Sequence, residues 1–226
     1  MKSLTLVIPA KNEEYSLPKI LDELKKIKCK KLIVLSKKDF KTIRSIKNYR
    51  CQILKQKHDG YGNAIIEGIN KVKTNYLCIF NADGSFDPKY LKSMIRKINS
   101  GNNFIFASRY SKNGGSEDDS FLTLVGNKIF TFIGNFFFNL KISDILFTYI
   151  IGETIKFKDL KLNNHDFRIC VEIPIKIKLK KYKYDTITAY ERKRLGGEKK
   201  VREFKDGWLI MLELIKSYFN KYGKKN

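Results

Sequence analysis

The sequence predicts an α/β fold with a mostly parallel central sheet and helices on both of its faces. Short apolar runs have the composition of strands that are buried on both sides: residues 4–8, 32–35, 76–80 and 104–107. The segments between them place apolar side chains at helical spacing: residues 17–27, 63–71 and 88–99. Strands that alternate with amphipathic helices in this way are typical of parallel sheets with crossover helices.

Less regular patterns complete the expected chain. Residues 43–46 suggest a short helix, and residues 51–54 suggest a third, weaker strand. Residues 171–179 alternate apolar and charged side chains, which predicts a half-exposed edge strand. Residues 208–219 have the spacing of a closing amphipathic helix.

A strongly apolar and aromatic segment, residues 121–140, leaves two interpretations open. The first is a helix in the protein core, which is the default for a stripe of this kind. The second is a helix that lies in a membrane interface, with Lys128 and Lys141 flanking the aromatic stripe. Both interpretations predict a helix, and they differ in what its apolar face contacts.

The net charge of +23 is the strongest compositional signal in this chain of 226 residues. Nucleic-acid binding would explain such a charge, but the sequence contains no RNP-type, zinc-finger or helix-turn-helix pattern, so we expect no nucleic-acid partner. Attraction to anionic lipid headgroups or to phosphorylated substrates explains the charge equally well.

Cysteine use and hydropathy exclude several other classes. The four cysteines are widely spaced and form no C-x-x-C pair, which argues against zinc and against a disulfide framework: Cys29, Cys51, Cys78 and Cys170. The apolar part of the N-terminus is too short for a signal peptide, and no run of about 18 apolar residues occurs. We therefore expect a cytoplasmic protein, with peripheral contact to the inner face of the cell membrane as an option.

The chain is organised around residues 75–89, where a buried strand stops abruptly at Asn81. Asp83 follows, and Ser85 comes two residues later. Ligands of open α/β sheets bind beyond the carboxyl ends of the strands, so Asp83 is expected to project into such a crevice. Carboxylate, amide and hydroxyl oxygens suit Mg²⁺ or Mn²⁺ carrying a diphosphate. The alternative is a loop in which Asp83 bonds only its own turn.

Other polar residues follow the other predicted strands. Asn12 and Glu13 come after the first strand, Ser36 after the second, and the Gly60–Gly62 turn after the third. Because these strand ends meet at one edge of a parallel sheet, we expect their side chains to converge. Amide, carboxylate and closely approaching backbone groups are what a nucleotide requires.

Segments in this order resemble family 2 glycosyltransferases with the GT-A fold. Ile8-Pro-Ala-Lys-Asn-Glu13 is similar to the family's opening V-I-P-x-x-N-E, and Asn81-Ala-Asp83 with Phe86-Asp-Pro88 is similar to its D-A-D-x-x-H-P-P segment. The remaining segments resemble the dolichyl/polyprenyl-phosphate mannosyltransferase branch: Phe106-Ala-Ser-Arg-Tyr110 with Gly114-Gly115, Ser143-Asp144, and Arg194-Leu-Gly-Gly-Glu-Lys-Lys200.

The resemblance implies roles for particular residues. Those of the nucleotide pocket are Pro9, Ala10, Lys11, Asn12, Glu13, Leu35 and Ser36. Those of the diphosphate and metal site are Asn81, Ala82 and Asp83, with Ser85 as a further ligand. Those that neutralise phosphates of the donor or of a phosphorylated acceptor are Arg109, Arg194 and Lys200. The residues implied in catalysis are Asp83, Asp144 and Arg109, with Asp144 as the base for a sugar acceptor.

Departures from the family pattern affect three places. Asn81 stands where the family has the first aspartate of D-A-D, which removes one negative charge from the metal site. Ser36-Lys37 replaces an aspartate pair at the nucleotide pocket, and Phe147-Thr-Tyr149 replaces the segment after Asp144.

The resemblance implies an inverting, metal-dependent glycosyltransferase that uses Mg²⁺ or Mn²⁺ and a UDP- or GDP-linked sugar. Residues 1–110 would form the nucleotide-sugar-binding half, and residues 111–226 the acceptor half of one GT-A domain. The expected acceptor is a polyprenyl phosphate at the membrane. Two alternatives stay open: transfer to a lipid-linked or surface-polysaccharide saccharide, and a catalytically weak protein that binds nucleotide sugars.

Overall fold

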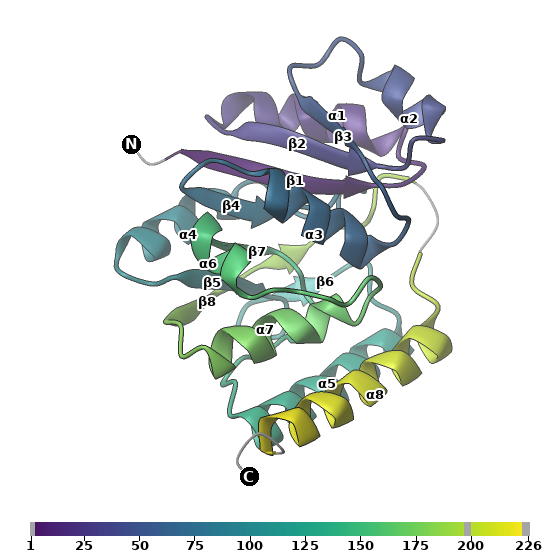
Figure 1. Ribbon diagram of the computed structural model, residues 1–226. Coiled ribbons are helices and arrows are strands. Elements are labelled where there is room, and N and C mark those ends of the chain that lie inside the picture. The colour runs from purple at the N-terminus through teal and green to yellow at the C-terminus, as the bar shows by residue number, and fades with distance from the viewer. Residues whose placement is uncertain (1–2, 197–199, 223–226) are drawn as a thin grey trace.

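The computed structural model describes residues 3–196 and 200–222 of the chain. Its centre is a seven-stranded sheet with the order β3-β2-β1-β4-β7-β5-β8 (Figure 1). Strand β7 runs antiparallel to β4 and β5, whereas the other pairs are parallel, so the predicted mostly parallel sheet is confirmed. The strands are β1 (Leu4–Ala10), β2 (Lys30–Leu35), β3 (Gln52–Lys55), β4 (Tyr76–Ile79), β5 (Phe104–Ser108), β7 (Ile150–Glu153) and β8 (Tyr184–Thr188).

Helices cover both faces of this sheet, as predicted. Leu6 and Ile8 of β1 point to the face covered by α1 and α4, and Val7 between them points to the face covered by α3, α6 and α7. The helices are α1 (Ser16–Glu23), α2 (Phe40–Ser45), α3 (Tyr61–Lys71), α4 (Tyr90–Asn99), α5 (Phe121–Phe138), α6 (Thr154–Asp159), α7 (Ile169–Leu179) and α8 (Glu203–Tyr222), and the 3₁₀ turn η1 (Leu24–Lys26) continues α1.

Residues 171–179, predicted as a half-exposed edge strand, belong instead to helix α7. That prediction was wrong because the helix is buried nearly all round, so a charged residue in its sequence does not mark a solvent-facing side. The buried Glu172 carboxylate accepts hydrogen bonds from the backbone N–H groups of Asn163 and Asn164, both at 2.9 Å. It also pairs with Lys176, one turn later, at 2.6 Å. A charged side chain can be buried when its hydrogen bonds are satisfied within the protein. Its place in the sequence then says nothing about the alternation of buried and exposed positions.

Helices α5 and α8 lie side by side at one end of the molecule and form a further layer with α7 (Figure 1). Helix α5 starts where the Ser120 hydroxyl accepts a hydrogen bond from the Thr123 N–H at 3.2 Å, and it ends at Asn139 with a φ of 53°. Within the part of the chain that the structure describes, α5 is the one helix with the length and composition to cross a membrane. The predicted helices at 121–140 and 208–219 are thus confirmed, and α8 is longer than expected.

A second, two-stranded sheet connects the segment after β5 with the C-terminal part of the chain. It consists of β6 (Gly115–Ser116) and β9 (Tyr190–Glu191), which run parallel. This pairing holds the polar segment 111–120 beside the segment that leads to Arg194.

Candidate functional site

The carboxyl ends of β1, β2 and β4 border a cavity of about 1180 Å³. Residues from α3, α5 and α8 also line it, so the two halves of the chain contribute to one wall. The volume exceeds that of a typical small-molecule pocket, which leaves space for a nucleotide sugar and a second molecule.

Asp83 lies on this wall, in the turn that follows β4. Its Oδ1 accepts hydrogen bonds from the Ser85 N–H at 3.0 Å and from the Ser85 hydroxyl at 2.8 Å. The alternative that Asp83 bonds its own turn is therefore observed, and it coexists with a half-buried carboxylate at the cavity. Gly84 has a φ of +90°, and a Cβ there would lie 2.5 Å from Leu195, so the turn requires glycine.

The segment 192–195 crosses this turn and is held by backbone bonds. The Arg192 N–H donates to the Ser85 carbonyl at 2.9 Å, and the Leu195 N–H donates to the Asp83 carbonyl at 2.8 Å. The Arg192 guanidinium also donates to the Gly84 carbonyl at 3.0 Å. These bonds bring Arg194, which lies between the anchored residues, to the cavity wall.

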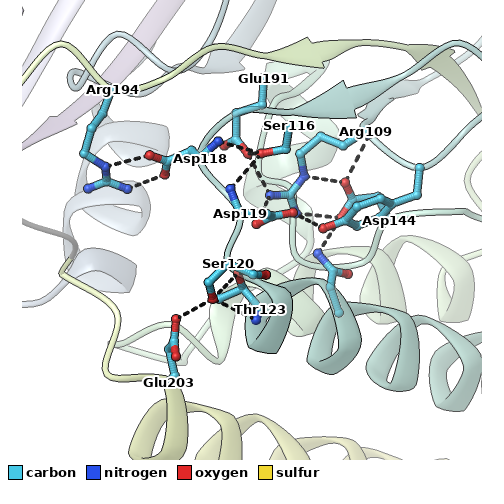
Figure 2. Close-up of polar contacts among 12 residues, drawn as sticks. Arg109, Ser116, Asp118, Asp119, Ser120, Thr123, Asp144, Glu191, Arg194 and Glu203 are labelled. Carbon is cyan, nitrogen blue, oxygen red and sulfur yellow. Dashed lines mark hydrogen bonds and ion pairs between the residues drawn. The ribbon is translucent and has the colours of Figure 1, made fainter.

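Arg194 and Lys200, predicted to bind phosphates, both line the cavity and both pair with carboxylates. Arg194 donates to the two oxygens of Asp118 at 2.9 and 2.5 Å (Figure 2). Lys200 pairs with Glu13, whose other oxygen accepts from the Ser16 hydroxyl at 2.5 Å. Burial raises the pKa of Glu13, and the bonds from Lys200 and Ser16 oppose that rise.

Arg109 is buried among three carboxylates (Figure 2). It donates to Asp144 from Nε at 2.7 Å, to Glu191 at 2.9 Å and to Asp119 at 3.3 Å. Burial lowers the pKa of the Arg109 guanidinium, but the attraction of Asp144 and the other carboxylates more than offsets this and the net pKa is raised. Asp144 also accepts from the Asn127 amide at 2.9 Å, so its carboxylate is committed to protein donors.

The part of the cavity beyond the ends of β1 and β2 contains a carboxylate that the sequence pattern did not single out. Asp39 is buried and accepts from the Asn12 N–H at 2.8 Å, and its other oxygen caps α2 by accepting from the Thr42 N–H at 3.2 Å. Asn12 has a φ of 54°, which this contact stabilises. Asp39 supplies negative charge close to Ser36, where the family's aspartate pair is absent.

Tyr61 connects the turn that follows β4 with Thr148 and Phe167, which also line the cavity. Its hydroxyl donates to Asn81 Oδ1 at 3.4 Å and forms a second hydrogen bond with the Thr148 hydroxyl at 2.7 Å. Its ring stacks on Phe167 with centroids 5.0 Å apart. The neighbouring Gly62 packs against the backbone of another segment of the protein and not against the cavity, because a Cβ there would lie 2.2 Å from the Asn164 carbonyl. The close backbone approach expected for a nucleotide is thus made by the protein itself.

Most of the residues singled out from the sequence lie on the cavity wall: Pro9, Ala10, Lys11, Asn12, Glu13, Ser36, Asn81, Ala82, Asp83, Arg109, Arg194 and Lys200. Leu35, Ser85 and Asp144 are buried and do not line it. Ser85 instead orients Asp83, and the position of Asp144 does not support a role as a base. Sequence reasoning missed further wall residues, among them Asp39, Asp118, Asp119 and Glu191. Tyr61 belongs to the Gly60–Gly62 turn that was expected at the site.

The oxygen donors at this site fit a divalent cation that is shared with a ligand. Asp83 and Asn81 offer hard oxygens, but the described residues contain no group of three or more His, Cys, Asp or Glu that would hold a metal ion alone. Among the residues that the structure describes, the wall carries nine carboxylates against six lysine and arginine side chains, although the whole protein has a charge of +23. An acidic wall of this kind favours an anionic ligand that arrives with a cation.

Comparison with known proteins gives the family. The model of glycosyl transferase family 2 matches residues 5–160. An uncharacterized glycosyltransferase of Mycobacterium bovis is 26% identical over 107 residues, which is 47% of this chain and 49% of the relative, and one of Mycobacterium tuberculosis matches equally. The chain therefore spans about half the length of these curated relatives.

Solved structures share the fold. Mannosyl-3-phosphoglycerate synthase from Rubrobacter xylanophilus superposes with a TM-score of 0.73 at 12% identity, over 99% of this chain and 75% of that one. Glucosyl-3-phosphoglycerate synthase from Mycobacterium tuberculosis, solved with Mn²⁺, UDP and glucosyl-3-phosphoglycerate, gives 0.74 at 10% identity, over 96% of this chain and 80% of that one.

At such low sequence identity these structures support only the fold. That fold is GT-A, which confirms the fold predicted from the sequence. The family match is more specific, because it covers more than half of the chain and includes the ends of β1, β2 and β4 that border the cavity. The protein belongs to glycosyl transferase family 2.

Proposed function

We propose that this protein transfers a sugar from a nucleoside-diphosphate sugar to an acceptor that carries a phosphate. The observation that carries the proposal is the convergence of Asp83, Arg194 and Lys200 on one cavity in a family 2 protein. A diphosphate needs such a set: a carboxylate to share a cation with it, and positive side chains to meet its remaining charge.

The donor would bind across the strand ends. Its base and ribose would lie near Ser36 and Asp39, and its diphosphate near Asp83 and Arg194. Asp83 and Asn81 would hold Mg²⁺ or Mn²⁺, which supplies charge stabilisation for the departing nucleoside diphosphate. Arg194 would meet two phosphate oxygens with its planar fork once it releases Asp118.

The transfer itself would be a displacement with inversion. An acceptor oxygen forms a bond to the anomeric carbon from one side, while the bond from that carbon to the diphosphate oxygen breaks on the other. The electron pair of the broken bond leaves with the nucleoside diphosphate. An ionised phosphate acceptor brings no proton to this step, which is consistent with the enclosed position of Asp144.

We consider two sources of a phosphate acceptor. One is a polyprenyl phosphate, the acceptor that the sequence segments imply. The other is a small phosphorylated acid, because the structural neighbours are named for phosphoglycerate products and one was solved with such a product. A saccharide hydroxyl is less well supported, since it requires a base and Asp144 is committed to Arg109 and Asn127.

The test is turnover of radiolabelled UDP- and GDP-sugars with Mn²⁺, using a short-chain polyprenyl phosphate, 3-phosphoglycerate or a free saccharide as acceptor. The proposal expects release of nucleoside diphosphate that depends on one phosphate acceptor and is lost in Asp83→Ala. Turnover with the saccharide alone would contradict the phosphate acceptor. Saturable binding of a nucleotide sugar without turnover on any acceptor would favour a binding protein instead.

A further inference from the structure

Helices α5 and α8 each expose a stripe of apolar side chains that the sheet and α7 leave uncovered. On α8, the stripe has helical spacing and consists of Phe204, Trp208, Leu212, Ile215 and Phe219. On α5, the exposed apolar residues are Phe121, Leu122, Ile129, Phe132, Phe136 and Phe137. Trp208 is 66% exposed and Phe136 is 71% exposed, values that are unusual for such large apolar groups in a protein of this size.

The two stripes form one surface because the helices run in parallel, side by side (Figure 1). At their starts, the Ser120 hydroxyl donates to the Glu203 carboxylate at 3.1 Å, and near their ends the rings of Phe137 and Tyr218 lie 5.0 Å apart. At about 100° per residue, each stripe lies opposite the buried side of its own helix. Both stripes therefore face away from the sheet, and together we call them the α5–α8 face.

Lysines border this face on its two outer sides. By helical position, Lys128 lies on the side of α5 away from α8, and Lys205 and Lys216 lie on the side of α8 away from α5. All three are exposed. Helix α5 contains no acidic residue. Of the three acidic residues of α8, Asp206 and Glu213 are buried, and the half-buried Glu203 accepts the Ser120 hydrogen bond at the start of the helix. The α5–α8 face is thus an apolar strip between positive edges.

We propose that the α5–α8 face docks on the surface of an anionic lipid bilayer, with the two helices lying in the interface. Aromatic and aliphatic side chains would enter the boundary between headgroups and acyl chains, while the lysines would meet lipid phosphates. A net charge of +23 strengthens attraction to such a surface. The same charge would repel a second copy of the chain, which argues against a homodimer that covers the α5–α8 face.

A transbilayer position of α5 is inconsistent with the polar contacts on its inner side. The Asn127 amide donates to Asp144 at 2.9 Å, and the Thr131 hydroxyl accepts from the Ile145 N–H at 3.1 Å. Crossing a bilayer would break these bonds, whereas docking of the outer side leaves them intact.

The α5–α8 face and the cavity lie on opposite sides of the same two helices. Thr123 and Asn127 of α5, and Asp206 and Ile210 of α8, line the cavity from the inner sides of the same two helices. A bilayer on the outer side of these helices would bring a lipid phosphate near the part of the cavity that α5 and α8 line. This link rests on the proposed function, whereas the docking itself does not.

Vesicle binding tests the proposal without nucleotide or turnover. Trp208 is the single tryptophan of the chain, so its emission reports on this face alone. The full chain is mixed with phosphatidylcholine vesicles that contain 30% phosphatidylserine, or none, and binding is measured by sedimentation and by the Trp208 emission maximum. We expect binding to the anionic vesicles together with a blue shift of the emission.

The variant Phe132→Glu/Phe136→Glu removes apolar character from the α5 stripe and keeps the reporter. It should weaken binding at least tenfold. The matched control is Phe40→Glu/Ile155→Glu, which changes two exposed apolar residues of α2 and α6 and should bind as the wild type does. Circular dichroism checks that both variants are folded.

Several results would overturn the proposal. Binding that is unchanged in Phe132→Glu/Phe136→Glu, or that leaves the Trp208 emission unshifted, would mean attachment through surface charge elsewhere. A blue shift that rises with protein concentration in the absence of lipid, together with a dimer in sedimentation equilibrium, would identify a second copy as the occupant. Absence of binding to both vesicle types would exclude a lipid surface.

Discussion

The guanidinium of Arg194 donates to both oxygens of Asp118, from Nε at 2.9 Å and from Nη2 at 2.5 Å. In the absence of a nucleotide sugar, the Arg194 guanidinium, which we expect to bind the diphosphate, is thus paired with a carboxylate of the protein. Binding of a diphosphate must displace Asp118 or bind in spite of its charge.

Asp118→Ala should therefore tighten the binding of UDP or GDP, by roughly three- to tenfold, because the phosphates no longer compete for Arg194. Isothermal titration with nucleotide in the presence of EDTA measures this, since the metal then makes no contribution. Weaker binding would show that Asp118 positions Arg194 rather than competing for it.

The Arg109 cluster predicts a large effect on stability. Arg109→Met would leave the buried Asp144 and Glu191 and the half-buried Asp119 without their shared cation, which should cost about 3–5 kcal/mol of unfolding free energy. Urea unfolding followed by circular dichroism provides the measurement. Lys97→Met, which breaks a half-exposed pair with Asp185, is the control and should cost less than about 1 kcal/mol.

Glu191 predicts a pH dependence of stability. Burial raises the pKa of its carboxyl above the ordinary value of 4.5, and Arg109 only partly opposes this because three carboxylates share that guanidinium. A raised pKa stabilises the folded state fully below pH 4.5, and this contribution is lost as the pH rises through the raised value.

Relative to Glu191→Gln, the wild type should therefore lose stability between pH 4.5 and neutrality. Melting temperatures of both proteins at pH 4, 5, 6 and 7 give the comparison. A difference in melting temperature that is constant over this range would contradict the raised pKa.

Two helical glycines form a matched pair for the packing at the cavity wall. Gly62→Ala should destabilise the protein by about 1–3 kcal/mol, because its Cβ would lie 2.2 Å from the Asn164 carbonyl. Gly126→Ala in α5 meets no atom closer than 4.0 Å and should stabilise by about 0.5–1 kcal/mol. Thermal unfolding of the two variants measures both effects. Equal melting temperatures would mean that the 164–166 segment does not pack on the start of α3.

Strand β8 (Tyr184–Thr188), which is parallel to β5, was not predicted, because its sequence is mostly polar. Strands β1 to β5 and their strand-end residues could be predicted because each of these strands is a local, mainly apolar run. Strand β7 could not, since Ile150–Glu153 sits between β4 and β5 only through tertiary pairing and runs antiparallel to both. The prediction failed at α7 because this helix is buried on nearly every side. It therefore lacks the polar residues at helical spacing that mark the exposed face of an amphipathic helix.

The positions of the site residues were largely predictable, but their partners were not. Asn81, Asp83 and Glu13 follow strands, and strand ends meet at one edge of the sheet. The ion pairs of Arg194 and Arg109 join residues 76 and 82 positions apart, so no local pattern reveals them. Asp144 shows the consequence: its position in the sequence suggests a base, whereas its bonds to Arg109 enclose it.

The central claim is that Asp83 holds a divalent cation together with the diphosphate of a nucleotide sugar. A thermal-shift screen of UDP-, GDP-, CMP- and dTDP-linked sugars, each with and without Mn²⁺, tests it most directly. Asp83→Ala is compared with Asp87→Ala, which removes a carboxylate four residues later that does not line the cavity.

The account predicts that one nucleotide raises the melting temperature, that Mn²⁺ enlarges the shift, and that only Asp83→Ala abolishes this enlargement. A shift that is the same with and without Mn²⁺, or that persists in Asp83→Ala, would contradict the shared metal site.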